Sequence, residues 1–191
     1  MDMKTISIVT TAVSIIVGMR GTAAADNRQA PVTPPQAAAT GRASSDQGTN
    51  AALNAFRRIE KLAGRWAAPL PGGGTLVDVF RPFAEGTGVL MEEWSGHGQA
   101  TSTVFYVVGS ELRADHYCDL KNQPHWIVKE GTDPLILEFN FAGATNLDKH
   151  PEHFHSAKWH LIDVKHLTQD WHMEGGPDGT KQMVLTFTRK K

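Results

Sequence analysis

Two pairs of nitrogen- and sulfur-bearing side chains stand two positions apart in segments that alternate between apolar and polar residues. His116 and Cys118 form the first pair, and His153 and His155 form the second. Residues two apart on a β-strand project to the same side, about 6–7 Å from each other. Two such pairs on facing strands would offer zinc four ligands of suitable type. The same imidazoles could instead hydrogen-bond buried carbonyl and hydroxyl groups, since buried polar groups need partners.

A carboxylate adds a second possible chemistry to the same interior. Glu93 shares a strand face with Val89 and Met91, so it is expected to point inward together with His116. A carboxyl group beside an imidazole in a dry cavity can shift both pKa values toward neutrality, which suits acid–base catalysis. A structural ion pair has the same ingredients. The sequence contains no G-x-S-x-G nucleophile motif.

Large apolar residues occupy the remaining inward positions. They could line a cavity for a flat apolar ligand, such as haem with His116 or His155 as its axial ligand, or they could form an ordinary core. Neither zinc nor haem is favoured by the residues alone. The same alternation predicts that Gln169 and Met183 face inward. The predicted ligand-binding set is Glu93, His116, Cys118, His153, His155, Met91, Phe139, Trp159 and Trp171.

The elements that must position these side chains are short β-strands. Segments of period-two alternation, separated by turn residues, predict strands over 65–67, 75–81, 88–95, 100–108, 111–118, 125–129, 135–141, 153–162, 166–174 and 182–188. Gly109-Ser110 and the 175–179 segment read as turns. Without long helical crossovers, a parallel α/β fold is excluded. A closed antiparallel up-and-down barrel of about ten strands is favoured, because closure removes free sheet edges and that strand number leaves room for a cavity.

The first 25 residues have the pattern of a secretory signal peptide. Lys4 precedes the apolar run Ile6–Gly18, and Ala23-Ala24-Ala25 offers a small-residue cleavage site. The apolar run is too short to span a bilayer comfortably. We therefore expect a periplasmic or secreted protein whose mature form has no integral membrane span.

Between this segment and the barrel, composition changes twice. Residues 26–49 are rich in Ala, Pro, Thr, Gln and Ser, which predicts a disordered linker. From Asn50, Leu53, Phe56 and Ile59 recur at helical spacing, and Gly64 stands where such a helix would end. The barrel domain is therefore predicted to cover 50–191, with a short N-terminal helix that plugs one end.

Charge and cysteine content exclude some classes of function. The chain of 191 residues has a formal net charge of −1 and no basic stripe, so nucleic acid is not an expected partner. Cys118 is the single cysteine, so an intramolecular disulfide is impossible, and its thiol is expected to be buried or bound. Asn122-Gln123-Pro124 is predicted to form a turn whose amides hold a loop at the barrel mouth.

Four short motifs carry a family resemblance over residues 62–189. They are His116-Tyr117-Cys118, Asn122-Gln123-Pro124, Gly143-Ala144-Thr145-Asn146-Leu147 and His153-Phe154-His155-Ser156. Together they resemble the HYC…GNQP, GGTN and HxHS motifs of an uncharacterised bacterial family with a calycin, or lipocalin-like, barrel. The nitrobindins, whose ten-stranded barrel binds haem, are a more distant likeness. Leu62-Ala63-Gly64-Arg65-Trp66 is similar to the Gly-x-Trp of many calycins, in which the tryptophan closes the barrel bottom.

The resemblance implies an architecture and attaches no activity to it. The sequence is thus interpreted as an exported lipocalin-like barrel that binds a small apolar or amphipathic molecule in its cavity. Two other classes stay open. One is a metal-binding or acid–base enzyme that uses the inward His, Cys and Glu side chains. The other is a purely structural or interaction module.

Overall fold

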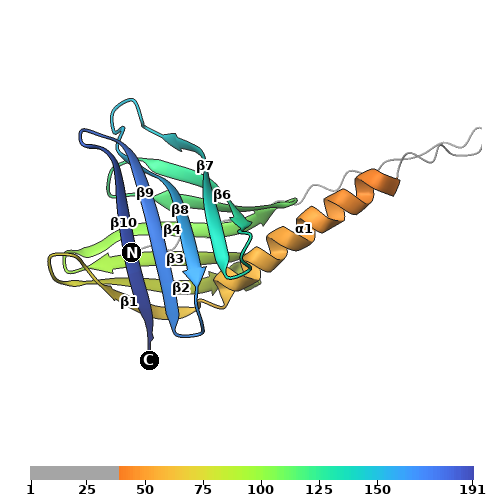
Figure 1. Cartoon of the computed structure of the whole chain (residues 1–191), viewed down its shortest axis with the longest axis horizontal. Helices are drawn as coiled ribbons and strands as arrows, with labels where there is room; N and C mark the ends of the chain where they lie inside the picture. The colour runs from red at the N-terminus through yellow and green to blue at the C-terminus, as the bar shows by residue number, and fades with distance from the viewer. Residues whose placement is uncertain (1–38) are drawn as a thin grey trace, which may run out of the picture. The chain divides into compact units, whose positions relative to one another are not determined.

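A closed antiparallel barrel follows a single helix in the computed structural model, which describes residues 39–191 (Figure 1). Each strand pairs with its neighbours along the chain, and β10 pairs with β1, so no sheet edge is left open. The predicted up-and-down barrel of about ten strands is confirmed. The elements are α1 (Ala39–Glu60), β1 (Gly64–Pro69), β2 (Thr75–Phe83), η2 (Ala84–Gly86), β3 (Gly88–Ser95), β4 (Gly98–Val108), β5 (Glu111–Tyr117), β6 (Gln123–Glu130), β7 (Ile136–Thr145), β8 (His153–Leu161), β9 (His166–Gly176) and β10 (Gly179–Lys190).

The hairpin turns lie where turn residues predicted them. Gly109 adopts a φ of +59° between β4 and β5, a left-handed conformation that glycine adopts without a steric penalty. Strands β9 and β10 extend further than expected, to Gly176 and from Gly179, so that only Pro177 and Asp178 separate them. Short turns of this kind fix the register of each pair, and the register decides which side chains share the interior.

The helix is longer than predicted. It begins at Ala39 rather than Asn50, so residues 39–49 of the predicted linker are helical. Ala is the strongest helix former, and the Ala-rich composition that suggested disorder also suits a helix. Ala52, Ala55, Phe56 and Ile59 are buried against the barrel at helical spacing. The predicted signal peptide (1–25) and the rest of the predicted linker (26–38) lie outside the described residues.

Directly after α1 the chain closes one end of the barrel. Trp66 is fully buried, and its indole Nε1 donates to the Leu62 carbonyl at 2.7 Å. The guanidinium of Arg189 lies over the Trp66 ring at 4.4 Å from its centroid. It also donates to the carbonyls of Lys61 at 2.6 Å and Ala63 at 2.7 Å. One arginine on the last strand therefore provides hydrogen bonds for two carbonyls of the segment that joins α1 to β1.

Replacing Arg189 with alanine should lower the free energy of unfolding by about 2 kcal/mol, because charge-assisted hydrogen bonds and the cation–π contact are lost together. Arg189→Lys should recover less than half of this loss, since an ammonium group cannot reproduce the planar fork. Urea denaturation followed by circular dichroism measures both. A loss below 0.5 kcal/mol for the alanine variant would contradict this role.

The half of the barrel nearest α1 has a filled interior. Trp159, Phe139 and Phe105 are buried completely or nearly so and contact one another through their rings, with 4.6 Å between the centroids of Phe139 and Trp159. The sequence predicts that Phe139 and Trp159 line a cavity. Instead they are packed core, because ten strands carry enough large aromatic side chains to fill this part of the barrel.

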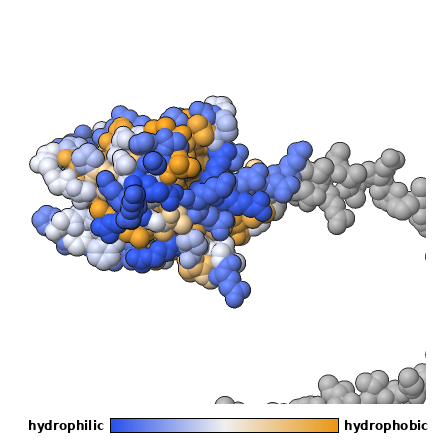
Figure 2. Space-filling view, turned by 90° about the horizontal axis from the view of Figure 1, so that it is seen from below, coloured by the Kyte–Doolittle hydropathy of each residue, from blue (hydrophilic) through white to orange (hydrophobic). Residues whose placement is uncertain are grey.

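Polar side chains cover much of the barrel face seen in Figure 2, with apolar patches between them. The exposed large apolar residues come from different strands and turns: Phe83, Trp94, Val108, Tyr117, Leu135, Ile162, Val164 and Val184. Single exposed apolar residues are ordinary in proteins. In the described part of the chain, no helix combines the length and apolar character needed to cross a membrane.

Candidate functional site

A small cavity lies inside the barrel, beyond the aromatic core and toward the end opposite α1. Its volume is about 10 Å³, roughly the space of one water molecule. The lining residues come from β3, β5, β8, β9 and β10: Met91, Glu93, His116, Phe154, Trp171 and Met183. Four of them, Glu93, His116, Met91 and Trp171, belong to the ligand-binding set predicted from the sequence. The cavity therefore brings together part of that set, and it adds Phe154 and Met183.

Cross-strand register explains why a histidine and a methionine meet at this cavity. Met91 is opposite Thr103, and Thr103 is opposite His116. Residues directly opposite each other on neighbouring strands project from the same face of a sheet. The three side chains thus form one inward layer across β3, β4 and β5.

A second layer, closer to the end of the barrel opposite α1 (called the open end below), is mostly polar. Asp78 is opposite Glu93, and Glu93 is opposite Thr101. Asp78 and Thr101 are buried, while Glu93 is partly exposed. Two carboxyl groups and a hydroxyl group therefore stand side by side inside the barrel, directly above the layer that holds His116.

Of the two ring nitrogens of His116, one is hydrogen-bonded and the other has no partner among the described residues. Its Nδ1 lies 2.8 Å from the hydroxyl of Thr103, and its ring packs against Trp126 and Phe154. Its Nε2 is buried and has no protein partner in the described chain. Burial lowers the pKa of His116 to about 4, so the ring is neutral at pH 7. When Nδ1 carries the proton and donates it to Thr103, Nε2 offers a lone pair toward the cavity.

Only one of the two carboxyl oxygens of Asp78 is hydrogen-bonded within the described chain. The amide of Gln169 donates to Asp78 Oδ2 at 2.7 Å, and the indole of Trp171 donates to Gln169 Oε1 at 2.9 Å. Asp78 Oδ1 has no partner among the described residues. Burial, and then the charge of Glu93, raise the pKa of Asp78 well above its ordinary value.

Glu93 is also shifted toward its neutral form. Burial of its carboxyl group, and then the negative charge of Asp119, raise its pKa to about 7. Adjacent buried carboxyl groups disfavour each other's ionisation. At neutral pH the Glu93 carboxyl is therefore balanced between its two protonation states, and a nearby positive charge would shift it to the carboxylate.

The second histidine pair does not reach this cavity. A β-bulge between Phe154 and Ser156 inserts His155 as an extra residue in β8, and Phe154 lines the cavity instead. His153 Nε2 lies 3.2 Å from His155 Nδ1, and the His155 ring stacks on Phe141. The structure therefore does not bring His153 and His155 to the lining of this cavity, because one extra residue changes which side chains face inward.

Cys118 also lies apart from the cavity lining. It follows the last residue of β5, and its Sγ is 3.6 Å from Asp119 Oδ1. Burial raises the pKa of Cys118 to about 12, which keeps the thiol protonated. Over residues 39–191, no group of three or more His, Cys, Asp and Glu side chains is arranged to hold a metal ion. The described residues therefore do not form the four-ligand zinc arrangement that the sequence left open as one possibility.

Haem does not fit the observed cavity either. His116 Nε2 is buried without a partner among the described residues, but a cavity of about 10 Å³ cannot admit a porphyrin. The other axial ligand considered, His155, lies outside the lining. The residues present therefore do not form a haem pocket.

A buried asparagine connects two loops at the open end of the barrel. Asn122 is fully buried, and its amide donates to the carbonyls of His150 at 2.8 Å and Glu152 at 2.7 Å. The predicted role of Asn122, holding the mouth loop through side-chain to backbone bonds, is confirmed. This tie links the β5–β6 turn to the β7–β8 loop beside the cavity.

Sequence reasoning did not identify Asp78 as a site residue. Asp78 lies between Leu76 and Phe80, which are both buried on the same face of β2. The alternation itself could have revealed Asp78, because it places this carboxylate between two inward-facing apolar residues. Gln169 was predicted to be internal, but its hydrogen bond to Asp78 crosses the barrel and has no sequence signature.

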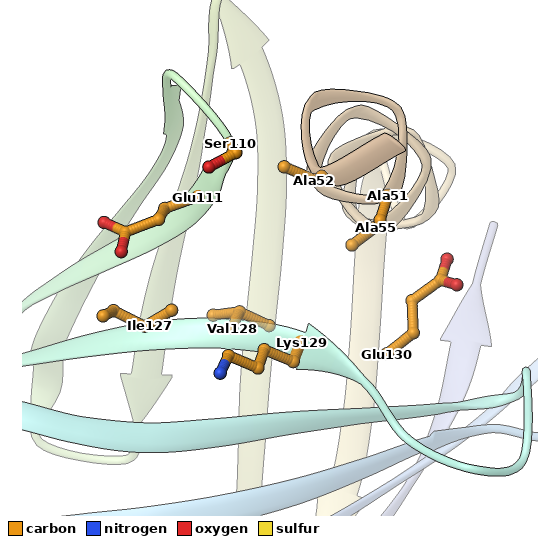
Figure 3. Close-up of a pocket in the computed structure, with 10 residues that line it drawn as sticks. Ala51, Ala52, Ala55, Ser110, Glu111, Ile127, Val128, Lys129 and Glu130 are labelled. Carbon is orange, nitrogen blue, oxygen red and sulfur yellow. The ribbon is translucent and has the colours of Figure 1, made fainter. Parts of the chain in front are cut away.

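A larger groove lies outside the barrel, between α1 and strands β5 and β6 (Figure 3). It has a volume of about 320 Å³, and Ala51, Ala52 and Ala55 of the helix face Val128 across it. Of the buried polar atoms without partners in the described chain, none belongs to a residue that lines this groove. The interior cavity is therefore the stronger candidate site.

No family model matches the chain, and no curated protein matches it. Among solved structures, the crystal structure of Rv2717c from M. tuberculosis matches with a TM-score of 0.54 and 12% identity, over 72% of this chain and 98% of that chain. A structure described as EF1p2_mFAP2b bound to DFHBI matches with a TM-score of 0.32 and 13% identity, over 71% of this chain and 99% of that chain. The second likeness is too weak to support an inference. The first shows that the fold is a calycin-like barrel and, at this identity, nothing beyond the fold.

Proposed function

We propose that the protein is an exported carrier that binds a small amphipathic molecule at the open end of its barrel. One observation carries this proposal: buried polar atoms that have no partner among the described residues 39–191 gather beside the cavity. They are Asp78 Oδ1, Thr101 Oγ1 and His116 Nε2. An unsatisfied buried polar group costs about 1–3 kcal/mol, so native proteins keep few of them. A bound molecule with polar and apolar parts would offset these costs.

The lining allows the cavity to enlarge around a ligand. Met91 and Met183 are unbranched and adapt their shape at low cost. Phe154 and Met183 are only partly buried, so they can move toward solvent without disturbing the aromatic core. A cavity with room for about one water molecule can therefore open to a small organic molecule.

Export and family membership belong to the same proposal. The signal-peptide pattern of residues 1–25 supports a periplasmic or secreted location. The HYC, NQP and HxHS motifs support membership of the bacterial calycin-like family described above. A carrier in those compartments would meet its ligand outside the cytoplasm.

A thermal-shift panel of small apolar and amphipathic molecules tests the proposal. A compound present at about 100 times its Kd adds about 2.7 kcal/mol, which corresponds to about 5–10 °C for a domain of this size. Met183→Trp fills the cavity and should abolish the shift. Val184→Trp, at the exposed neighbouring position on β10, should keep it.

Two results would overturn the carrier proposal: no compound raises the melting temperature, or Met183→Trp responds as the wild type does. Met183→Phe serves as a milder second variant if the tryptophan disturbs folding. Circular dichroism of each variant without ligand shows whether the barrel is intact.

A further inference from the structure

The polar groups around the cavity share one electrostatic character. Glu93 on β3 and Asp78 on β2 contribute carboxyl groups, and His116 on β5 is a neutral acceptor. Asp119, after β5, adds a further negative charge near Glu93. Among the described residues that line the cavity, none is Lys or Arg. This part of the structure is therefore rich in hydrogen-bond acceptors and contributes no basic side chain to the lining.

The apolar side of the cavity suits a cation as well. Trp171 and Phe154 both line it, with their ring centroids 5.3 Å apart at an interplanar angle of 69°. Aromatic faces attract cations, and most strongly when both partners are removed from water. Met91 and Met183 complete a wall that would contact hydrocarbon.

We propose that the ligand is a protonated amine, whose ammonium group binds between Glu93, Asp78 and His116. Its hydrocarbon part would lie against Trp171 and Phe154. This inference rests on the proposed carrier function and specifies its ligand class. An ammonium group donates up to three hydrogen bonds, and Asp78 Oδ1, His116 Nε2 and the Glu93 carboxylate are suitable acceptors.

A metal ion would be the other natural cation for carboxyl groups. The described residues 39–191 hold no cluster of three or more ligating side chains arranged for one. An ammonium group needs hydrogen-bond acceptors and no fixed set of coordinating ligands. The hydrocarbon chain of the amine would occupy the apolar part of the cavity. The combination of acceptors and aromatic rings therefore favours an amine.

Isothermal titration with three ligands of equal chain length tests the inference: hexylamine, hexan-1-ol and hexanoate. At pH 8 hexylamine should bind at least tenfold more tightly than hexan-1-ol, and hexanoate should bind most weakly. If hexan-1-ol binds as tightly as hexylamine, the amine inference fails and the carrier proposal stands. If none of the three binds while the thermal-shift panel yields another ligand, the amine inference also fails alone. If neither experiment finds a ligand, both proposals fail.

A charge-removing variant locates the ammonium group. Glu93→Gln should weaken hexylamine binding at least tenfold and leave hexan-1-ol binding unchanged. Glu138→Gln is the matched control, because Glu138 lies outside the cavity lining on β7, with its side chain 38% exposed, and pairs with Lys158 at 3.2 Å. Equal hexylamine affinity in Glu93→Gln and the wild type would overturn the inference. Asp78→Asn provides a second variant, with a weaker but detectable loss expected.

The affinity for hexylamine should depend on pH in a defined direction. The ionisable groups that face Glu93 are Asp78 on β2, His116 on β5, and Cys118 and Asp119 after β5. Because the pKa of Glu93 is about 7, its carboxyl group is mostly protonated at pH 6. Hexylamine should therefore bind about tenfold more weakly at pH 6 than at pH 8, while hexan-1-ol should bind equally at both. A pH-independent affinity for hexylamine would contradict a role for the Glu93 carboxylate.

Discussion

Replacing Trp159 with alanine is expected to lower the free energy of unfolding by about 3–5 kcal/mol, the range for removing a fully buried aromatic side chain. Trp159 is completely buried, and its ring lies 4.6 Å from that of Phe139, 5.8 Å from Phe105 and 6.0 Å from Phe80. No neighbouring side chain can collapse into the space, because the surrounding rings already pack against one another. Urea denaturation followed by circular dichroism measures the loss.

Trp159→Phe is the matched control for this prediction. The indole Nε1 of Trp159 is buried and has no partner within the described part of the chain, so its removal breaks no hydrogen bond there. The phenylalanine variant should therefore lose about 1–2 kcal/mol, well below the alanine variant. A loss below 1 kcal/mol for Trp159→Ala would show that the barrel interior is less filled than described.

The second large effect concerns stability: two residues at the cavity are expected to change the free energy of unfolding with pH in opposite directions. In the folded protein the pKa of Glu93 is raised to about 7 from an ordinary value of 4.5. Between these values the folded state binds more protons than the unfolded state, so the stability contribution of Glu93 falls as pH rises. The full shift corresponds to about 3 kcal/mol, and partial exposure of Glu93 reduces this to about 2 kcal/mol.

His116 acts in the opposite direction over an overlapping pH range. Its folded-state pKa is lowered to about 4 from an ordinary value of 6.5. Between these values the unfolded state binds more protons, so the stability contribution of His116 falls as pH falls. The shift corresponds to about 3 kcal/mol. The two groups therefore mask each other in the wild-type protein.

Single variants should reveal the separate contributions of Glu93 and His116 to the pH dependence of stability. Relative to the wild type, Glu93→Gln should gain about 2 kcal/mol in stability as pH rises from 4.5 to 7, and His116→Gln should gain about 3 kcal/mol as pH falls from 6.5 to 4. The double variant should return close to the wild-type pH dependence. Urea denaturation at four or five pH values measures each difference. Differences of the same sign in both single variants would refute the proposed environment.

The strands and the closed barrel could be predicted because their signals are local. Alternating residues and turn glycines define each hairpin, and hairpins joined in order close into a barrel. The inward positions of Glu93 and His116 followed directly, since each is in line with buried neighbours on its own strand, such as Met91 and Ala114. Alternation in an uninterrupted strand is sufficient for such residues.

Other parts of the site depend on features that alternation does not record. The bulge in β8 turns Phe154 toward the cavity in place of His153 and His155, and no residue type marks the bulge in the sequence. Alternation also gives the face of a residue but not its depth along the barrel axis. Trp159 therefore lies in the filled core, whereas Trp171, on a comparable inward face, borders the cavity.

Comparison of native and denaturing mass spectra tests the central claim most directly, namely that the open end of the barrel holds a small molecule. The protein would be purified without added metal or chelator. The carrier account predicts a mass excess of a small organic molecule in the native spectrum, its loss on denaturation, and its absence from Met183→Trp but not from Val184→Trp. A native mass equal to that of the polypeptide, or an excess retained by Met183→Trp, would contradict it.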